Sequence, residues 1–341
     1  MDPRERQASI DRAVEFLAAA QESDGAFAVL ARRRGALDLE AADPSPFSTA
    51  LVARGLESVP SPAARAILER ALDSLQRAQS TGGVWKHWPP GHPRAASLPP
   101  DADDTACAID LLARRRGLAL APRAALLAAG RDASGRFHTW ILPRLSAAGR
   151  PLAALRLLRW RTYAARRHPF WDATEARPDD VDAGVNANVL LALGDRPATA
   201  PAARWLADRI ARGDEASADK WHRHPWAVRF FVARAMERHA GLAAAAGPAL
   251  GRRIAGEAPS LVAAGDALAL ALATAAARHA PVERELAGTL AEALAARQEG
   301  DGGFPRAELY FGGPRESVGW GSRALTTGIA LVGLGAPGVT E

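Results

Sequence analysis

The sequence has little cysteine, lysine or tyrosine. Cys107 is the single cysteine among 341 residues, which excludes an intrachain disulfide and a cysteine-rich zinc site. Lys86 and Lys220 are the only lysines, so arginine carries nearly all of the positive charge. The arginines recur at intervals within alanine-rich segments, which is typical of solvent-exposed helix faces. We therefore expect no nucleic-acid partner.

Long apolar runs are also missing. No run approaches the ~20 residues that a membrane-spanning helix needs, and residues 1–7 lack the apolar core of a secretion signal. We expect a cytoplasmic protein. The arginine clusters at 32–34 and 114–116 are the candidates for peripheral contact with an anionic membrane surface.

The composition is that of a globular protein, with 48% hydrophobic and 24% charged residues. Strand signals are weak, and the proline-rich stretches 89–100 and 305–314 are expected to be loops. No interdomain linker is evident. We predict that residues 1–341 form a single domain.

A short turn motif recurs along the chain. It has glutamine in the first position, glycine in the fifth and an aromatic residue in the seventh. The copies span residues 21–27, 79–85 and 298–304, and a fourth at 131–137 lacks the glutamine. The glutamine is predicted to bond the free carbonyls at the end of the preceding helix, while the glycine permits the chain reversal and the aromatic fills the corner.

Each copy of the motif follows an amphipathic helix and precedes a more apolar one, which indicates stacked helix pairs. The outer helices are predicted at 10–20, 64–78, 123–129, 200–212, 250–254 and 283–296. The inner helices are predicted to begin near 47, 104, 185, 226, 260 and 325. Six outer helices around six inner ones predict an all-α fold, a single (α/α)6 toroid.

An acidic string opens the second inner helix. Asp101, Asp103 and Asp104 lie within four residues and precede an apolar run at 106–112. Burying three carboxylates is costly unless one of them stays protonated, and a neutral carboxylic acid can donate a proton to an alkene. The alternative is helix capping, with Asp101 at the N-cap and Asp104 three residues later.

The turn motif and the acidic string carry a resemblance to a known superfamily. The turns resemble those of squalene–hopene cyclases and protein prenyltransferase β-subunits, and residues 101–106 resemble the Asp-x-Asp-Asp-Thr-Ala acid motif of class II terpene cyclases. This resemblance implies an α-barrel cyclase or isomerase that protonates an alkene of a small apolar isoprenoid substrate. Asp103 would donate the proton, and Asp101 and Asp104 would keep it protonated.

Two departures from these relatives qualify the resemblance. Cys107 lacks the Asp-x-Cys spacing of the prenyltransferase zinc site, so we predict no metal ligands. Class II cyclases usually place their cavity between two α-barrels, and this chain has the length for one. A partner domain or a second copy of the chain is expected to close the cavity, unless the pocket is more open.

The inner helices of a toroid begin at the same end, so their first residues should meet there. Five tryptophans are predicted to line a pocket for a carbocation, because each aromatic face stabilises a cation by up to about 2 kcal/mol. They are Trp88, Trp171, Trp221, Trp226 and Trp320.

A second acidic string, with Asp180 and Asp182, precedes Asn186 and Asn188 at the start of another inner helix. It predicts a Mg²⁺ site for a substrate diphosphate, a base that ends the reaction, or another helix cap with a hydrogen-bonded core asparagine. No cofactor is predicted apart from Mg²⁺ for a diphosphate substrate.

His224 lies in a segment rich in cations and aromatics, 220–226. This segment is a candidate to hold a diphosphate or carboxylate of the substrate, together with Arg159, Arg161 and Arg166. Ion pairing across the rim is the alternative.

Two other functions remain open. One is a carbohydrate-active (α/α)6 hydrolase or lyase, in which Asp103 pairs with Asp180 or Asp182 at roughly 5–10 Å. The other is a non-catalytic barrel that binds an apolar ligand or a partner protein.

Overall fold

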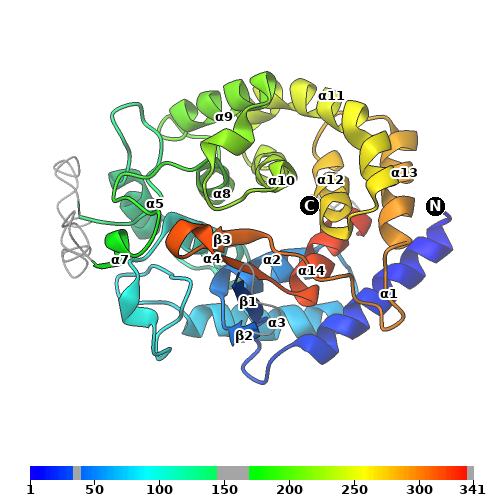
Figure 1. Ribbon diagram of the computed structural model, residues 1–341, viewed down its shortest axis with the longest axis horizontal. Coiled ribbons are helices and arrows are strands. Elements are labelled where there is room, and N and C mark those ends of the chain that lie inside the picture. The colour runs from blue at the N-terminus through cyan, green and yellow to red at the C-terminus, as the bar shows by residue number, and fades with distance from the viewer. Residues whose placement is uncertain (34–39, 144–168, 336–341) are drawn as a thin grey trace.

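A computed structural model describes residues 1–33, 40–143 and 169–335. These residues form helix pairs, each with one outer and one inner helix (Figure 1). The pairs are α1 (Pro3–Ala20) with α2 (Pro46–Glu57), α3 (Pro62–Arg77) with α4 (Ala102–Arg116), α5 (Leu120–Ala129) with α8 (Ala183–Leu193), α9 (Ala200–Arg212) with α10 (Pro225–Met236), α11 (Ala240–Ala264) with α12 (Ala267–Ala277), and α13 (Arg284–Ala295) with α14 (Arg323–Leu334).

The inner helices form a closed ring. They contact one another in the order α2, α4, α8, α10, α12 and α14, and α14 returns to contact α2. At that closing contact a Cβ on Gly55 would lie 2.0 Å from the carbonyl oxygen of Gly328, so the two helices meet backbone to backbone. In Figure 1 the ring is viewed along its axis. The predicted all-α (α/α)6 fold is confirmed.

Burial follows the expected pattern of inner and outer helices. Every residue of α8 and of α12 is buried, whereas the outer helix α9 buries only one stripe. The bounds of the fifth pair were wrong, because α11 runs to Ala264 and α12 begins only at Ala267. Gly265 ends α11 with a φ of 64°, and Asp266 caps α12 by accepting a hydrogen bond from the amide of Ala269.

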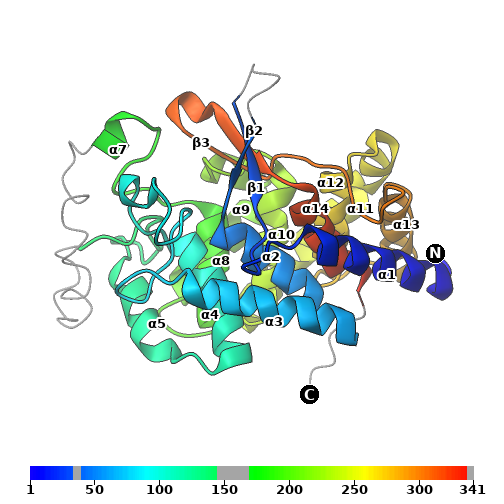
Figure 2. The same ribbon diagram turned by 90° about the horizontal axis from the view of Figure 1, so that it is seen from below.

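A small antiparallel sheet was not predicted. Its strand order is β2 (Glu40–Asp43), β1 (Val29–Arg33), β4 (Val318–Gly321) and β3 (Tyr310–Gly312). The sheet stands above one end of the barrel (Figure 2) and joins the connection after α1 to the one before α14. The remaining connections contain the short helices η1 (Ala95–Ser97), α7 (Pro169–Asp172), η4 (Glu215–Ala218) and η5 (Pro314–Glu316).

The glutamines of the turn motif link adjacent outer helices. The side-chain amide of Gln21 donates to a carbonyl of its own turn and to that of Ile67 in α3, at 2.9 and 3.0 Å. Gln298 does the same in its turn and with Ser9 in α1. The prediction that these side chains satisfy their own helix end was therefore wrong. The interactions instead bind one helix pair to the next.

The aromatic position of each turn is tied to the following inner helix. Its backbone N–H donates to a polar side chain in the first turn of that helix. The pairs are Phe27 with Thr49, Trp85 with Thr105, Phe137 with Asn186, and Phe304 with Thr327. Because these polar side chains bond the turns, the inner helices start at a common level.

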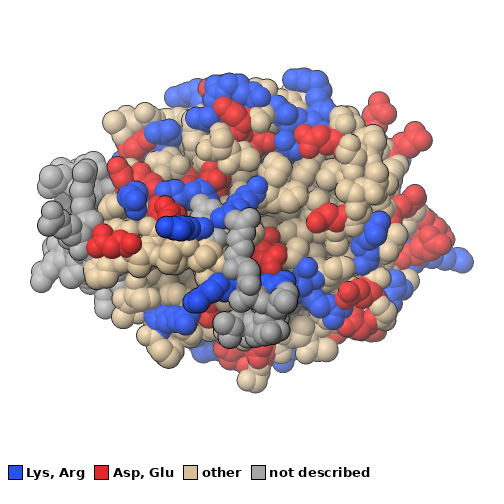
Figure 3. Space-filling model, in the orientation of Figure 1, with Lys and Arg blue, Asp and Glu red and all other residues tan. Residues whose placement is uncertain are grey.

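The two arginine clusters have different surroundings. Arg114 forms ion pairs with Glu57 and Asp110, and Arg116 pairs with Glu69 and Asp73. Arg34 of the other cluster lies outside the described residues. Positive and negative side chains are interspersed over the face in Figure 3. Within the described part of the chain, no helix combines the length and apolar character needed to cross a membrane.

The turn motif gives a stability prediction. Replacing Gly302 with alanine should lower the free energy of unfolding by roughly 1–3 kcal/mol, because this residue has a φ of 89° and a Cβ would lie 2.3 Å from the Arg12 carbonyl oxygen. Denaturant titration measures the change. Gly288→Ala is the control, since nothing lies within 4 Å of its added Cβ in α13, and it should stabilise by about 1 kcal/mol. A Gly302→Ala protein as stable as the wild type would contradict this account of the turn.

Candidate active site

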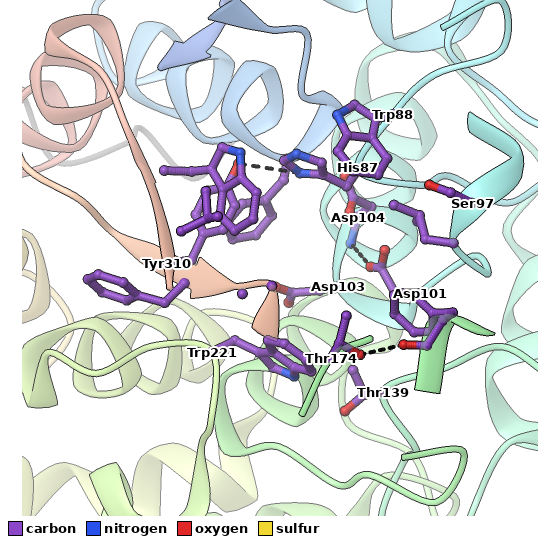
Figure 4. Close-up of a pocket in the computed structure, with 18 of the residues that line it drawn as sticks. His87, Trp88, Ser97, Asp101, Asp103, Asp104, Thr139, Thr174, Trp221 and Tyr310 are labelled. Carbon is purple, nitrogen blue, oxygen red and sulfur yellow. Dashed lines mark hydrogen bonds between the residues drawn. The ribbon is translucent and has the colours of Figure 1, made fainter. Parts of the chain in front are cut away.

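A cavity of about 600 Å³ lies at the end of the barrel where α2, α4 and α8 begin. Its walls are mainly aromatic, with Trp88, Trp140, Trp221, Tyr310 and Trp320 among the lining residues. Figure 4 shows the carboxylates of the acidic string among these rings. The sheet contributes Tyr310 and Trp320, so part of the wall comes from the connections between helix pairs.

The acidic string is both a helix cap and a cavity wall. Asp101 is the N-cap of α4, and its Oδ1 accepts a hydrogen bond of 2.7 Å from the amide of Asp104. The side chains of Asp103 and Asp104 take no part in that bond, and all three carboxyl groups line the cavity. The capping interpretation thus accounts for Asp101 and leaves two further acids to explain.

Burial favours the protonated form of all three acids. Removal from water raises the pKa of Asp103 and raises that of Asp101 to about 7. Burial and then the charge of Asp101 raise the pKa of Asp104 well above its usual value. The helix N-terminus favours a carboxylate, but desolvation outweighs it here. The site therefore retains protons that free aspartates would lose.

A line of hydrogen bonds fixes the orientation of Asp103. The side-chain amide of Asn188 donates to its Oδ1 at 2.6 Å, and the Asn188 oxygen accepts from the guanidinium of Arg234. Arg234 is buried, with Phe230 and Phe231 about it. Because a guanidinium only donates, it obliges Asn188 to present its NH₂ group to Asp103. Oδ2 of Asp103 is then the oxygen left to carry the proton.

His222 adds a positive charge near Asp103. Its Nδ1 lies 3.1 Å from Asp219 Oδ1, and Asp219 also accepts hydrogen bonds from backbone amides of Gly184 and His222. Burial opposes a charge on His222, but the Asp219 carboxylate more than offsets it and raises the pKa of His222. The positive charges of His222 and Arg234 favour the carboxylate form of Asp103, against the effect of burial. Burial raises the pKa of Asp103, and these positive charges limit the rise.

Three tryptophans of the wall are each anchored by a carboxylate. The indole N–H groups donate at 2.9 to 3.3 Å to aspartates, of which Asp43 also lines the cavity and Asp180 and Asp182 lie outside its lining. The pairs are Trp320 with Asp43, Trp221 with Asp182, and Trp140 with Asp180. Each carboxylate fixes the ring and leaves its face to the cavity.

The structure therefore gives Asp180 and Asp182 a different place from the one predicted. Neither lines the cavity. Asp182 accepts further hydrogen bonds from Thr139 and from the Lys220 amide, and Asp180 is paired with the Lys220 ammonium. Within the described ranges, no group of three or more His, Cys, Asp or Glu side chains is placed to hold a metal ion.

Four other predicted binding residues also lie outside the cavity lining. Trp171 packs behind the wall against Trp140, and Trp226 is buried beneath the guanidinium of Arg229. His224 is the N-cap of α10. Asn186 is fully buried, and its amide N–H groups are bonded to the carbonyls of Phe137 and Asp182.

The structure brings together Trp88, Trp320 and the three acids, as predicted. Arg159, Arg161 and Arg166 lie outside the described residues. The ion-pair alternative for the segment 220–226 is realised in the Lys220–Asp180 pair.

Sequence reasoning missed several residues of the cavity, notably Asp43, His87 and Tyr310. Asp43 and Tyr310 reach the cavity through strands whose pairing no local pattern indicated. His87 immediately follows the turn at 79–85 and precedes Trp88, and that position beside a predicted wall residue was the available signal.

Comparisons with known proteins bear on the fold. No family model matches the chain, and no curated protein matches it. Among solved structures, a protein from Actinoplanes has a TM-score of 0.71 at 22% identity, covering 96% of this chain and 98% of its own. The type II terpene cyclase MstE from Scytonema has a TM-score of 0.59 at 17% identity, covering 97% and 98%.

A third similar structure is an unsaturated glucuronyl hydrolase specific for heparin. Its TM-score is 0.52 at 13% identity, covering 98% of this chain and 96% of that one. At these identities the likeness establishes the shared barrel fold alone, and both cyclases and hydrolases use that fold. The function must be argued from the site.

The acidic string gives a prediction for stability against pH. The folded pKa of Asp101, about 7, exceeds the value of about 3.9 of a free aspartate, so the folded state binds the proton more tightly. Its contribution is fully present below about pH 4 and is lost as pH rises through about 7, by up to about 1.4 kcal/mol per pH unit.

Asp101→Asn keeps a capping oxygen and removes the titration. Denaturant titrations from about pH 4 to pH 8 should therefore show a flatter decline in unfolding free energy for this variant. Asp208→Asn, at an exposed site on α9, is the control and should leave the slope unchanged. Equal slopes for Asp101→Asn and the wild type would show that Asp101 ionises normally.

Proposed function

We propose that this protein is an acid-initiated terpene cyclase or isomerase, in which Asp103 protonates an alkene of an isoprenoid substrate. The observation that carries the proposal is the environment of Asp103. It is a partly buried carboxyl group that lines an aromatic cavity, with one oxygen fixed by Asn188 and Arg234.

The proposed first step moves one proton. The Oδ2–H bond of Asp103 breaks, and the π electrons of the alkene form a new C–H bond, which leaves a carbocation on the neighbouring carbon. The Asp103 carboxylate keeps its hydrogen bond from Asn188 and faces the charges of His222 and Arg234. These groups are already in place when the negative charge develops, so little reorganisation is needed.

The wall stabilises the cation that follows. Indole faces attract a cation without acting as bases, by up to about 2 kcal/mol each when desolvated. Hydrogen bonds to aspartate side chains prevent the rings of Trp140, Trp221 and Trp320 from turning. A second alkene of the same chain can then attack the cation and close a ring.

The size of the cavity indicates the size of the substrate. At roughly 30 Å³ per non-hydrogen atom, the volume of a water molecule in the liquid, a cavity of about 600 Å³ holds on the order of 20 such atoms. This fits a chain of about three or four isoprene units and is small for squalene. The count applies to the hydrocarbon chain and leaves any polar head group outside the cavity. Structures of MstE are described with geranylgeranyl dihydroxybenzoate as substrate, so prenylated aromatic acids are candidates alongside prenyl diphosphates.

The carbohydrate-active alternative is less well supported. Its proposed partners for Asp103 were Asp180 and Asp182, and both lie behind the indoles instead of in the cavity. The cavity wall also offers few hydroxyl and amide side chains to hydrogen-bond a sugar. A barrel that only binds a ligand would not need Asp103 to be oriented by two further buried residues.

The direct test is conversion of candidate substrates. Purified protein is incubated with geranyl, farnesyl and geranylgeranyl diphosphates, squalene, and geranylgeranyl dihydroxybenzoate, with and without Mg²⁺, and products are identified by mass spectrometry. We expect an isomeric cyclic product from at least one of them. Asp103→Asn should reduce turnover by about 10³-fold or more, because it removes the proton donor.

Asp73→Asn is the matched control, since Asp73 is an exposed carboxylate on α3 that pairs with Arg116, and it should retain wild-type turnover. Circular dichroism confirms that each variant folds. An Asp103→Asn protein that remains fully active would refute the role of Asp103, and release of sugar from unsaturated glucuronides would favour the hydrolase alternative.

Two asparagines on α8 separate catalysis from stability. Asn188→Ala should lower turnover by about 10- to 100-fold, because a hydrogen bond to a charged group contributes about 1.5–3 kcal/mol. Asn186→Ala, two residues away, should mainly lower the unfolding free energy, because it removes the bonds to the turn at 131–137. Turnover per folded molecule distinguishes the two effects. Equal turnover of the Asn188→Ala protein and the wild type would contradict the orientation argument.

A further inference from the structure

The cavity contains a second set of polar groups, on the wall formed by β2, β3 and the loop after α3. Tyr310 Oη lies 3.5 Å from His87 Nδ1, and His87 Nε2 lies 3.9 Å from Asp43 Oδ2. All three residues line the cavity. In Figure 4 a dashed line joins Tyr310 to His87, and a separate dashed line marks the hydrogen bond between Asp101 and Asp104. The acid-initiation step uses none of these groups.

The carboxylate at the end of this set is ionised. Burial would favour its protonated form, but the nearby His87 ring, 3.9 Å away, and a hydrogen bond from Trp320 lower the pKa of Asp43 to about 2. A carboxylate 3.9 Å away favours a proton on the nearer ring nitrogen, Nε2. His87 Nδ1 is then the basic nitrogen. It lies 3.5 Å from the Tyr310 hydroxyl, which donates a hydrogen bond to Ser45 Oγ at 3.2 Å and must turn to His87 to pass on its proton.

Aromatic rings surround His87 on several sides. Its ring makes edge contacts with Trp88, Tyr310 and Trp320, at centroid distances of 5.1 to 5.8 Å. The Tyr310 ring stacks on Trp320 at 5.6 Å, which fixes the hydroxyl group beside His87. Burial raises the pKa of Tyr310 well above its usual value. The phenol therefore stays neutral, and it can give its own proton to His87 only as it receives a proton from the substrate.

We propose that Tyr310 and His87, supported by Asp43, form the proton-accepting end of the cavity and terminate the reaction by deprotonating the final carbocation. This inference rests on the proposed function and extends it to the step that determines the product. Tyr310 would be the residue that contacts the substrate, and Asp43 would be a positioning residue.

The termination step is balanced as follows. A C–H bond next to the cationic carbon breaks, and its electron pair becomes the π bond of the product alkene. The proton bonds to Tyr310 Oη while the original hydroxyl proton moves to His87 Nδ1. The positive charge of the substrate is thereby transferred to His87, which becomes an imidazolium ion beside the Asp43 carboxylate. His87 releases the extra proton to solvent after the product leaves.

The test is the product distribution of Tyr310→Phe and His87→Phe. Both variants keep an aromatic ring in the wall and remove a proton acceptor. We expect substrate consumption within about tenfold of the wild type, and a change of about tenfold or more in the ratio of the normal alkene to other alkenes and water-captured alcohols. Products are quantified by mass spectrometry and assigned by NMR.

His279→Gln is the control, because this histidine pairs with Glu237, does not line the cavity and should leave the product ratio unchanged. Unchanged product ratios in both Tyr310→Phe and His87→Phe would overturn the proposal. Loss of the normal alkene together with continued consumption would support it, since a structural defect would lower consumption without redirecting the product.

A second measurement does not depend on activity. In ¹⁵N-histidine-labelled protein, with His87→Phe to assign the signal, we expect neutral His87 to carry its proton on Nε2. A proton on Nδ1 would overturn the relay even if the protein converted every substrate. If the wild type converts none of them, the proposed function fails, and this measurement still decides whether the predicted base exists.

Discussion

The site depends on the removal of the Asp103 carboxyl group from water. That single constraint raises its pKa, and it also makes every nearby charge and dipole more effective than it would be in solvent. The line from Arg234 through Asn188 to Asp103 runs from the barrel core to the cavity and decides which oxygen carries the proton. Without these hydrogen bonds, burial would still raise the pKa of Asp103, but neither carboxyl oxygen would be held in a fixed position.

The barrel supplies this environment through its repeated turns. Each turn is bonded to the next outer helix by a glutamine or to its inner helix by a threonine or asparagine, so inner helices begin at one level. Residues far apart in sequence then share one cavity. The connections above that level build the walls, and the side chains of Asp43, Asp180 and Asp182 hold the indoles of the cavity wall.

The sequence predicted the parts of this arrangement that depend on local pattern. Apolar periodicity and the turn motif predicted the helix pairs, and the acidic string predicted the acid group at the start of α4. The sheet was not predictable, because strands of three to five residues pair across some 290 positions of sequence. Asp43 and Tyr310 were missed for that reason. Asp180 and Asp182 were found but misplaced, since a hydrogen bond to an indole turns them away from the cavity and no sequence pattern reveals it.

The protonation state of Asp103 is the central claim, and carbon NMR of protein labelled at aspartate side-chain carboxyl carbons measures it directly. Comparison of the wild type with Asp103→Asn assigns the resonance, and a pH titration follows it. The account predicts a carboxyl signal that still shows the protonated form at neutral pH. A signal that titrates near the ordinary value of about 3.9 would contradict it.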